Sequence, residues 1–151
     1  MTKLYKDSGD PWLFNSLDGG EILIENGVVQ MSTGLGTAAY LSLFGGNYDD
    51  DGRKQNNLNW WGNLDEENPE NWYRSETQYL LDSLVPIPAN LNKLATAAER
   101  DLAWMLSSRV ASSVSCETSM PAHRQVKFVI AIDAEGEPQL FDFVENWKGS
   151  V

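Results

Sequence analysis

The most constraining feature of the sequence is an alternating run near its C-terminal end. From Val126 to Ile132, large apolar residues occupy every second position, with Lys127, Val129 and Ala131 between them. A period of two is typical of a β-strand, because successive side chains of a strand point to opposite faces. One face of this strand must be covered. The residues predicted to point toward the core are Val126, Phe128, Ile130 and Ile132.

Two further strands are predicted on either side of this run. Phe141 and Phe143 alternate with the segment's other residues from Leu140 to Val144, and a turn containing Gly136 lets this last strand pair back. Before the run, the residues from Val110 to Cys116 alternate between apolar and small polar side chains, as in a partly covered strand. Cys116 would then be an inert, inward-facing thiol.

Helices are predicted before these strands. The strongest has a continuous apolar stripe and a capping residue, Asn90, with a solvated face opposite the stripe. The stripe consists of Leu91, Leu94, Ala95, Ala98, Leu102, Met105 and Leu106, and the solvated face of Lys93, Glu99, Arg100 and Asp101. A shorter helix precedes it, with a capping box formed by Ser75 and Gln78, and ends at Val85–Pro86.

The N-terminal part is predicted to be an arm followed by a hairpin. Residues 1–18 form the arm, whose apolar patch Pro11–Phe14 packs on the chain itself or on a neighbour. Segments 21–25 and 28–31 flank Asn26-Gly27, the dipeptide preferred in type I′ turns. This register places Ile24 opposite Val29 and Ile22 opposite Met31, so that these four residues share one core-facing side.

A helix and a long loop connect the hairpin to the later helices. The helix is apolar nearly all round and ends at Phe44, where Gly45 and Gly46 are expected to adopt the left-handed conformation. A polar loop over residues 45–63 follows, and it closes on Trp60, Trp61 and Gly62. The two indoles either pack in the core or at an interface, or form a platform for stacking on sugars.

These elements predict an α+β fold in a single domain, residues 1–151. The net charge of −11 and the pI near 4.3 argue against nucleic acid and anionic membranes as partners, and favour a basic protein. Neither a membrane-spanning stretch nor a signal peptide is recognisable, so synthesis in a cytoplasm is expected.

The sequence offers few groups for chemistry. Its only histidine is His123 and its only cysteine is Cys116, so no metal site of the usual ligand spacing can be assembled from them. The run Asp49–Asp51 lacks the spacing of a calcium-binding loop. We therefore expect no catalytic residues, no cofactor, no bound metal and no enzymatic activity.

Five segments resemble the baseplate protein family typified by phage Mu. They are GEI at 20–22, GLGTAAYLSLF at 34–44, NWWGN at 59–63, RSETQYLL at 74–81 and AERDLAWML at 98–106. The resemblance extends from about Gly19 to the final strands, and Trp-Trp-Gly is its most specific part. Members of this family look like distant relatives of the small inner wedge protein of T-even phages. The Glu-Pro-Arg motif of that relative does not occur in this sequence.

The resemblance implies a structural protein of a contractile tail baseplate, located in the virion in six or more copies. Its implied partners are other baseplate wedge proteins and the tail sheath and tube or hub proteins. Sheath assembly would begin when one of the C-terminal strands pairs with a strand of a sheath protein. The resemblance does not identify which of these strands forms the pairing edge. The predicted partner-binding residues are Trp60, Trp61, Gly62, Val126, Phe128, Ile130, Phe141 and Phe143. The alternatives are a lysozyme-like tail enzyme that acts on the cell wall and a free-standing binding module.

Overall fold

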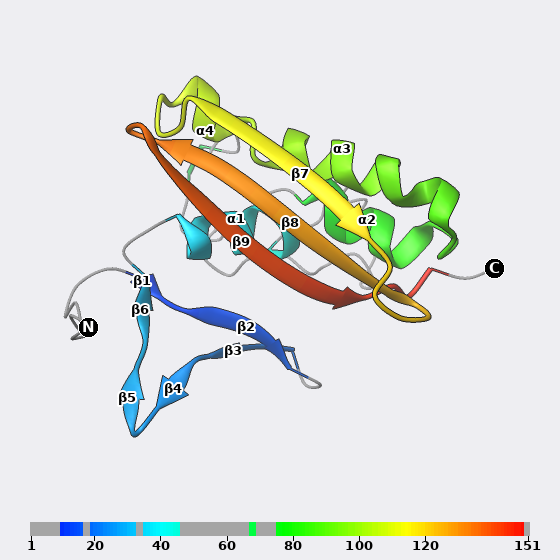
Figure 1. Ribbon diagram of the computed structural model, residues 1–151, viewed down its shortest axis with the longest axis horizontal. Coiled ribbons are helices and arrows are strands. Elements are labelled where there is room, and N and C mark those ends of the chain that lie inside the picture. The colour runs from blue at the N-terminus through cyan, green and yellow to red at the C-terminus, as the bar shows by residue number, and fades with distance from the viewer. Residues whose placement is uncertain (1–9, 17–18, 33–34, 46–66, 69–74, 150–151) are drawn as a thin grey trace.

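The computed structural model describes residues 10–16, 19–32, 35–45, 67–68 and 75–149. A three-stranded antiparallel sheet is covered by helices on one face, and short strand pairs from the N-terminal part lie beside its last strand (Figure 1). The predicted α+β class with C-terminal antiparallel strands is therefore confirmed.

The sheet consists of β7 (Ser113–Ser119), β8 (Gln125–Ala134) and β9 (Glu137–Asn146), with β8 in the middle. The inward-facing side chains of β8 are completely buried, as the alternation predicts. Glu135 and Gly136 join β8 to β9 with φ angles of 54° and 80°, the pair of positive values that a type I′ turn requires. Cys116 is buried beneath the sheet, also as predicted.

The helical stripe covers this sheet, but it is divided between two helices. α3 spans Leu91–Asp101 and α4 spans Trp104–Ser107. α3 ends before Leu102, whose amide donates to the carbonyls of Ala98 and Arg100. The chain then makes a turn before α4 begins. Leu94, Leu102 and Met105 are fully buried, whereas Leu106 is 43% exposed. The prediction of one continuous helix with Leu106 in its stripe is therefore wrong.

Two earlier helices complete the layer. α1 (Gly36–Phe44) packs its aromatic residues against β8 and β9, and α2 (Glu76–Ser83) lies against α3, with the short 3-10 helix η4 (Pro88–Asn90) between them. The ring centroids of Phe44 and Phe128 are 5.8 Å apart. Gly45 has a right-handed conformation, with φ at −89°, so the predicted left-handed end is wrong at this position. Gly46 and the polar loop after it lie outside the described residues.

Both predicted side-chain caps are replaced by other interactions. The Ser75 hydroxyl donates to the carbonyl of Ser42, 2.8 Å away in α1, and the Asn90 amide donates to the carbonyl of Val85. The N-terminus of α2 is instead capped by Asp101, whose carboxylate accepts from the amides of Glu76 and Thr77 at 3.0 and 2.9 Å. Asp101 was predicted to be solvated. Sequence spacing reveals local caps only, and this cap comes from another helix.

The C-terminal end of α2 is covered by the end of the chain. The amides of Lys148 and Gly149 both donate to the carbonyl of Leu81, and the Trp147 indole donates to the carbonyl of Leu84 at 2.8 Å. The Trp147 side chain is 1% exposed. A Cβ atom at Gly149 would overlap the Leu84 carbonyl, so this contact needs a glycine. The described chain end is thus part of the packed body.

The N-terminal strands form three short antiparallel pairs that meet at one point. β1 (Asp10–Pro11) pairs with β6 (Met31–Ser32), β2 (Leu13–Ser16) with β3 (Gly19–Ile22), and β4 (Ile24–Glu25) with β5 (Val28–Val29). Three main-chain bonds close the junction: Trp12 N to Gln30 O, Gln30 N to Leu23 O, and Leu23 N to Trp12 O, at 2.8 to 2.9 Å. Each of these three residues donates to one member and accepts from the other.

This junction changes the predicted hairpin. The turn is correct, since Asn26 and Gly27 have φ angles of 52° and 77°, and Ile24 does pair with Val29. The second predicted pair is wrong, because Ile22 pairs with Leu13 and Met31 with Pro11. The chain is also paired from Asp10 onward, which is earlier than predicted. The shared core face is wrong as well, because Ile22, Ile24 and Val29 are all exposed.

Candidate functional site

The predicted partner-binding residues of β8 belong to the core. Val126, Phe128 and Ile130 are 0% exposed, and their strand is paired with β7 on one side and with β9 on the other. A strand paired on both sides has no main-chain groups left for a third. If another strand extends this sheet, it must therefore pair with β7 or β9.

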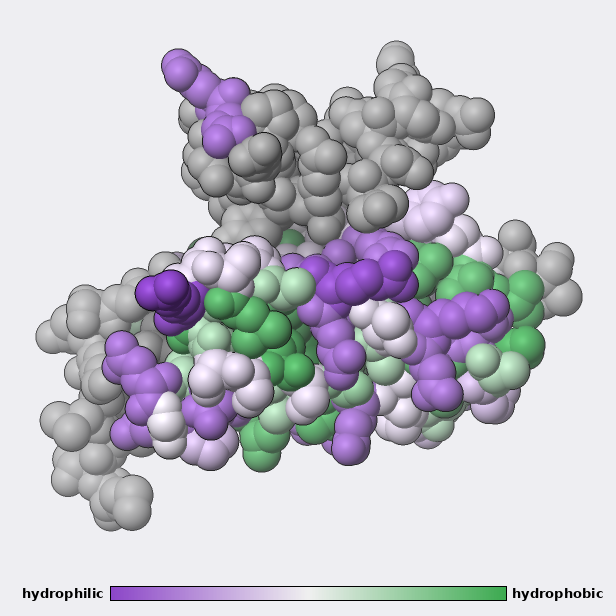
Figure 2. Space-filling model, turned by 90° about the horizontal axis from the view of Figure 1, so that it is seen from above, coloured by the Kyte–Doolittle hydropathy of each residue, from purple (hydrophilic) through white to green (hydrophobic). Residues whose placement is uncertain are grey.

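The outer edge of β7 is interrupted in the middle. The Cys116 amide, which points away from β8, donates to the Glu99 carboxylate of α3 at 3.0 Å. Nearby, the Thr118 hydroxyl donates to the carbonyl of Leu91 at the start of α3. Figure 2 looks onto the molecule from above the β7 side of Figure 1 and shows hydrophilic and hydrophobic residues interspersed there. A strand added to this edge would have to displace the Glu99 carboxylate from the Cys116 amide. The sequence predicts Glu99 to lie on the solvated face of its helix, so it does not predict this contact.

The outer edge of β9 presents a regular row of main-chain groups. In antiparallel pairs, successive residues alternate between bonding the neighbouring strand and facing away from it. Trp147 N donates to Arg124 O at the end of the β8–β9 ladder, so Phe143 and Phe141, which have the same parity, bond β8. Leu140, Asp142 and Val144 therefore direct their amides and carbonyls outward.

Two observations support β9 as the open edge. Pro138 is two residues before Leu140, so its backbone nitrogen also faces away from β8. Proline is tolerated in a sheet where its missing N–H would face away from the partner strand. Among the described residues, no main-chain bond engages the amides of Leu140, Asp142 or Val144. Leu140 and Val144 are also 71% and 47% exposed, and β2, which approaches β9, makes no main-chain bond to it among the described residues.

The side chains of the predicted residues Phe141 and Phe143 lie on the core side of β9. Their side chains are 6% and 8% exposed and pack on aromatic residues of the helical layer and the N-terminal junction. Phe143 lies 5.6 Å from Tyr40, and Phe141 lies 6.1 Å from Trp12, measured between ring centroids. The residues that a partner strand would meet are their neighbours Leu140, Asp142 and Val144. The position of Pro138 was the sequence signal that could have distinguished the two sets.

A buried carboxylate lies on the inner side of the same strand. Burial raises the pKa of Glu145 to about 7, although the positive charge of Lys148 lowers it in part. Burial also raises the pKa of Tyr40 to about 12, and the charge of Glu145 adds to that rise. The end of β9 thus has an acidic group whose ionisation is costly in the folded state.

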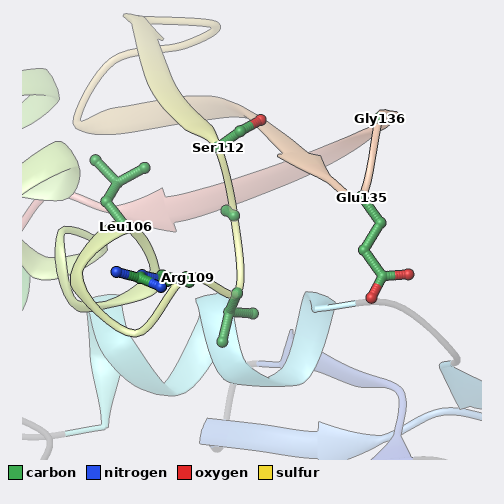
Figure 3. Close-up of a pocket in the computed structure, with 7 residues that line it drawn as sticks. Leu106, Arg109, Ser112, Glu135 and Gly136 are labelled. Carbon is green, nitrogen blue, oxygen red and sulfur yellow. The ribbon is translucent and has the colours of Figure 1, made fainter.

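The groove in Figure 3 lies at the opposite end of β9. It has a volume of about 560 Å³, is open to solvent, and runs between the end of α4 and the β8–β9 turn. Arg109 and Glu135 border it from opposite sides, with Leu106 and Ser112 nearby (Figure 3). One guanidinium, one carboxylate and one hydroxyl in an open groove do not form a nucleophile–base arrangement.

The remaining sequence predictions concern residues away from the edges of the sheet. Trp60, Trp61 and Gly62 lie outside the described residues, as does Asp49–Asp51. His123 is exposed in the connection between β7 and β8. Within the described ranges, no three histidine, cysteine or acidic residues are grouped so that they could hold a metal ion. None of the helices described is long and apolar enough to cross a membrane.

Comparisons with protein-family models, with curated proteins and with solved structures found no match for this chain.

Proposed function

We propose that this chain is a structural component of a contractile phage tail baseplate, in the inner wedge, where it helps to start sheath assembly by strand pairing. The proposal combines the motif resemblance of the sequence with one structural observation, the open edge of β9. Its partners would be wedge, sheath and tube or hub proteins, and its location the virion.

The β9 edge is suited to a selective partner. Main-chain bonds to Leu140, Asp142 and Val144 would supply affinity with little demand on the partner's sequence. An unprotected edge would also invite aggregation, and charged residues and proline reduce that risk. Pro138 lies near one end of β9, and Asp142 forms a 3.2 Å ion pair with Lys127 in its middle. The net charge of −11 favours a basic donor strand.

The test is a pair of substitutions at one position of this edge. Asp142→Pro removes an outward-facing amide without removing a bond to β8, whereas Asp142→Ala removes the ion pair and keeps the amide. We expect tails produced with the proline variant to lack assembled sheath, and tails produced with the alanine variant to be normal in electron micrographs.

Val114→Pro is the matched control on the other edge, because the Val114 amide has the same outward parity as that of Cys116. It should leave sheath assembly intact. Normal sheaths with a folded Asp142→Pro protein would contradict the proposal.

A further inference from the structure

A hairpin with exposed apolar side chains projects from the N-terminal junction. We call residues 22–29 the exposed hairpin; it contains β4, β5 and the Asn26-Gly27 turn (Figure 1). Ile22, Ile24, Val28 and Val29 are 47%, 61%, 50% and 40% exposed, which makes four of the nine exposed large hydrophobic residues in the described ranges. Clustering of such residues at one place is typical of an interaction site.

The pairing places its apolar residues on two faces. Ile24 and Val29 are directly opposite, so they share one face, while Glu25 and Val28 share the other. A fully apolar face beside a mixed one would fit a shallow apolar groove with a polar rim. A two-residue ladder with its side chains in water gains little stability alone, so packing alone does not account for these residues.

The junction holds this hairpin in a fixed place. The three bonds among Trp12, Leu23 and Gln30 fix the base of the hairpin, and Trp12 packs on Phe141. A Cβ atom at Gly36 would lie 2.6 Å from the Trp12 ring, so the start of α1 is in close contact with it. A surface held in this way loses less conformational entropy when it binds.

The charge around the hairpin determines which partner it fits. The segment from Glu21 to Gln30 contains two acidic residues and no lysine, arginine or histidine. Glu21 and Glu25, both exposed, are the acidic residues next to the apolar cluster. A second copy of the chain or an anionic lipid surface would bring like charges together, whereas basic residues would complement them.

We propose that the exposed hairpin is a docking surface for a partner protein, with Ile24 and Val29 seated in an apolar groove that has lysine or arginine at its rim. This surface is separate from the β9 edge, and the inference does not rest on the proposed baseplate function.

Site-specific photo-cross-linking tests this proposal in cells that express the chain from its own gene. A photoreactive phenylalanine analogue replaces Ile24, which is 61% exposed, and in a control chain it replaces Leu106 of α4, which is 43% exposed. We expect the Ile24 position to cross-link to another protein, at a segment where apolar residues neighbour lysine or arginine, at a yield at least tenfold above the Leu106 position.

Charge reversal distinguishes docking from non-specific contact. Glu21→Lys combined with Glu25→Lys should lower the yield at least tenfold, and Glu135→Lys with Glu137→Lys, the same charge change at the β8–β9 turn, should not. In a lysate of the same cells, added salt should lower the yield of the chain that carries the analogue at position 24 and no charge change, a result that does not depend on whether the charge variants fold. Cross-links to a second copy or to lipid, a yield equal to that at Leu106, or insensitivity to charge and salt would overturn the proposal.

Discussion

The C-terminal sheet and the N-terminal strand pairs show similar apolar alternation, yet the apolar side chains are buried in the sheet and exposed in the hairpin. In β8, each residue predicted to face inward is fully buried beneath the helices. In the exposed hairpin, Ile24 and Val29 pair as predicted, but their shared face is in water. Alternation shows which side chains share a face, and it does not show whether another element covers that face.

The largest expected contrast is in stability. Phe128→Ala should lower the free energy of unfolding by about 3–5 kcal/mol, because it leaves a cavity in the fully buried core. Ile24→Ala should change it by less than about 0.5 kcal/mol, since the side chain is exposed. Urea denaturation of both variants measures the difference. Equal losses would break the distinction between the two regions.

The second expected effect is a dependence of stability on pH that comes from the sheet. Because burial raises the pKa of Glu145 to about 7, the folded state favours the protonated form. Its contribution is fully present below the ordinary carboxyl pKa and is lost as pH rises through about 7, a loss on the order of 3 kcal/mol.

Glu145→Gln should remove this part of the pH dependence. Denaturation at pH 5 and pH 8 compares the two proteins, and the glutamine variant should be the more stable one at pH 8. Glu25→Gln is the control from the exposed hairpin and should leave the dependence unchanged. Parallel stability curves for the glutamine variant at position 145 and the unchanged chain would contradict this assignment.

A smaller effect is expected at the helix cap. Asp101→Ala leaves the amides of Glu76 and Thr77 without their acceptor and should cost about 1–2 kcal/mol. Glu99→Ala, on the same helix, removes one acceptor from the Cys116 amide and should cost less. Thermal unfolding of the two variants checks the order. A larger loss at Glu99 would show that the β7 edge needs its carboxylate more than α2 needs its cap.

The fold class and the core of the sheet could be predicted because local patterns specify them. The turn at Asn26-Gly27 and the alternation of β8 depend on residues close in sequence. The Asp101 cap and the junction of Trp12, Leu23 and Gln30 depend on contacts between distant segments, which no spacing rule reveals. Within the candidate site, the predicted residues Phe141 and Phe143 lie on β9, the strand whose edge carries the proposal. The outward-facing residues Leu140, Asp142 and Val144 could be identified only from the order of the strands and from which residues of β9 bond β8.

The central claim is that β9 is an open edge that another strand fills on assembly. Hydrogen–deuterium exchange with single-amide resolution tests it, in the free chain and in assembled tails. The amides of Leu140, Asp142 and Val144 should exchange rapidly in the free chain and become protected in the tail, while those of Phe141 and Phe143 stay protected in both. Slow exchange of the first set in the free chain, or no gain in their protection on assembly, would contradict the account.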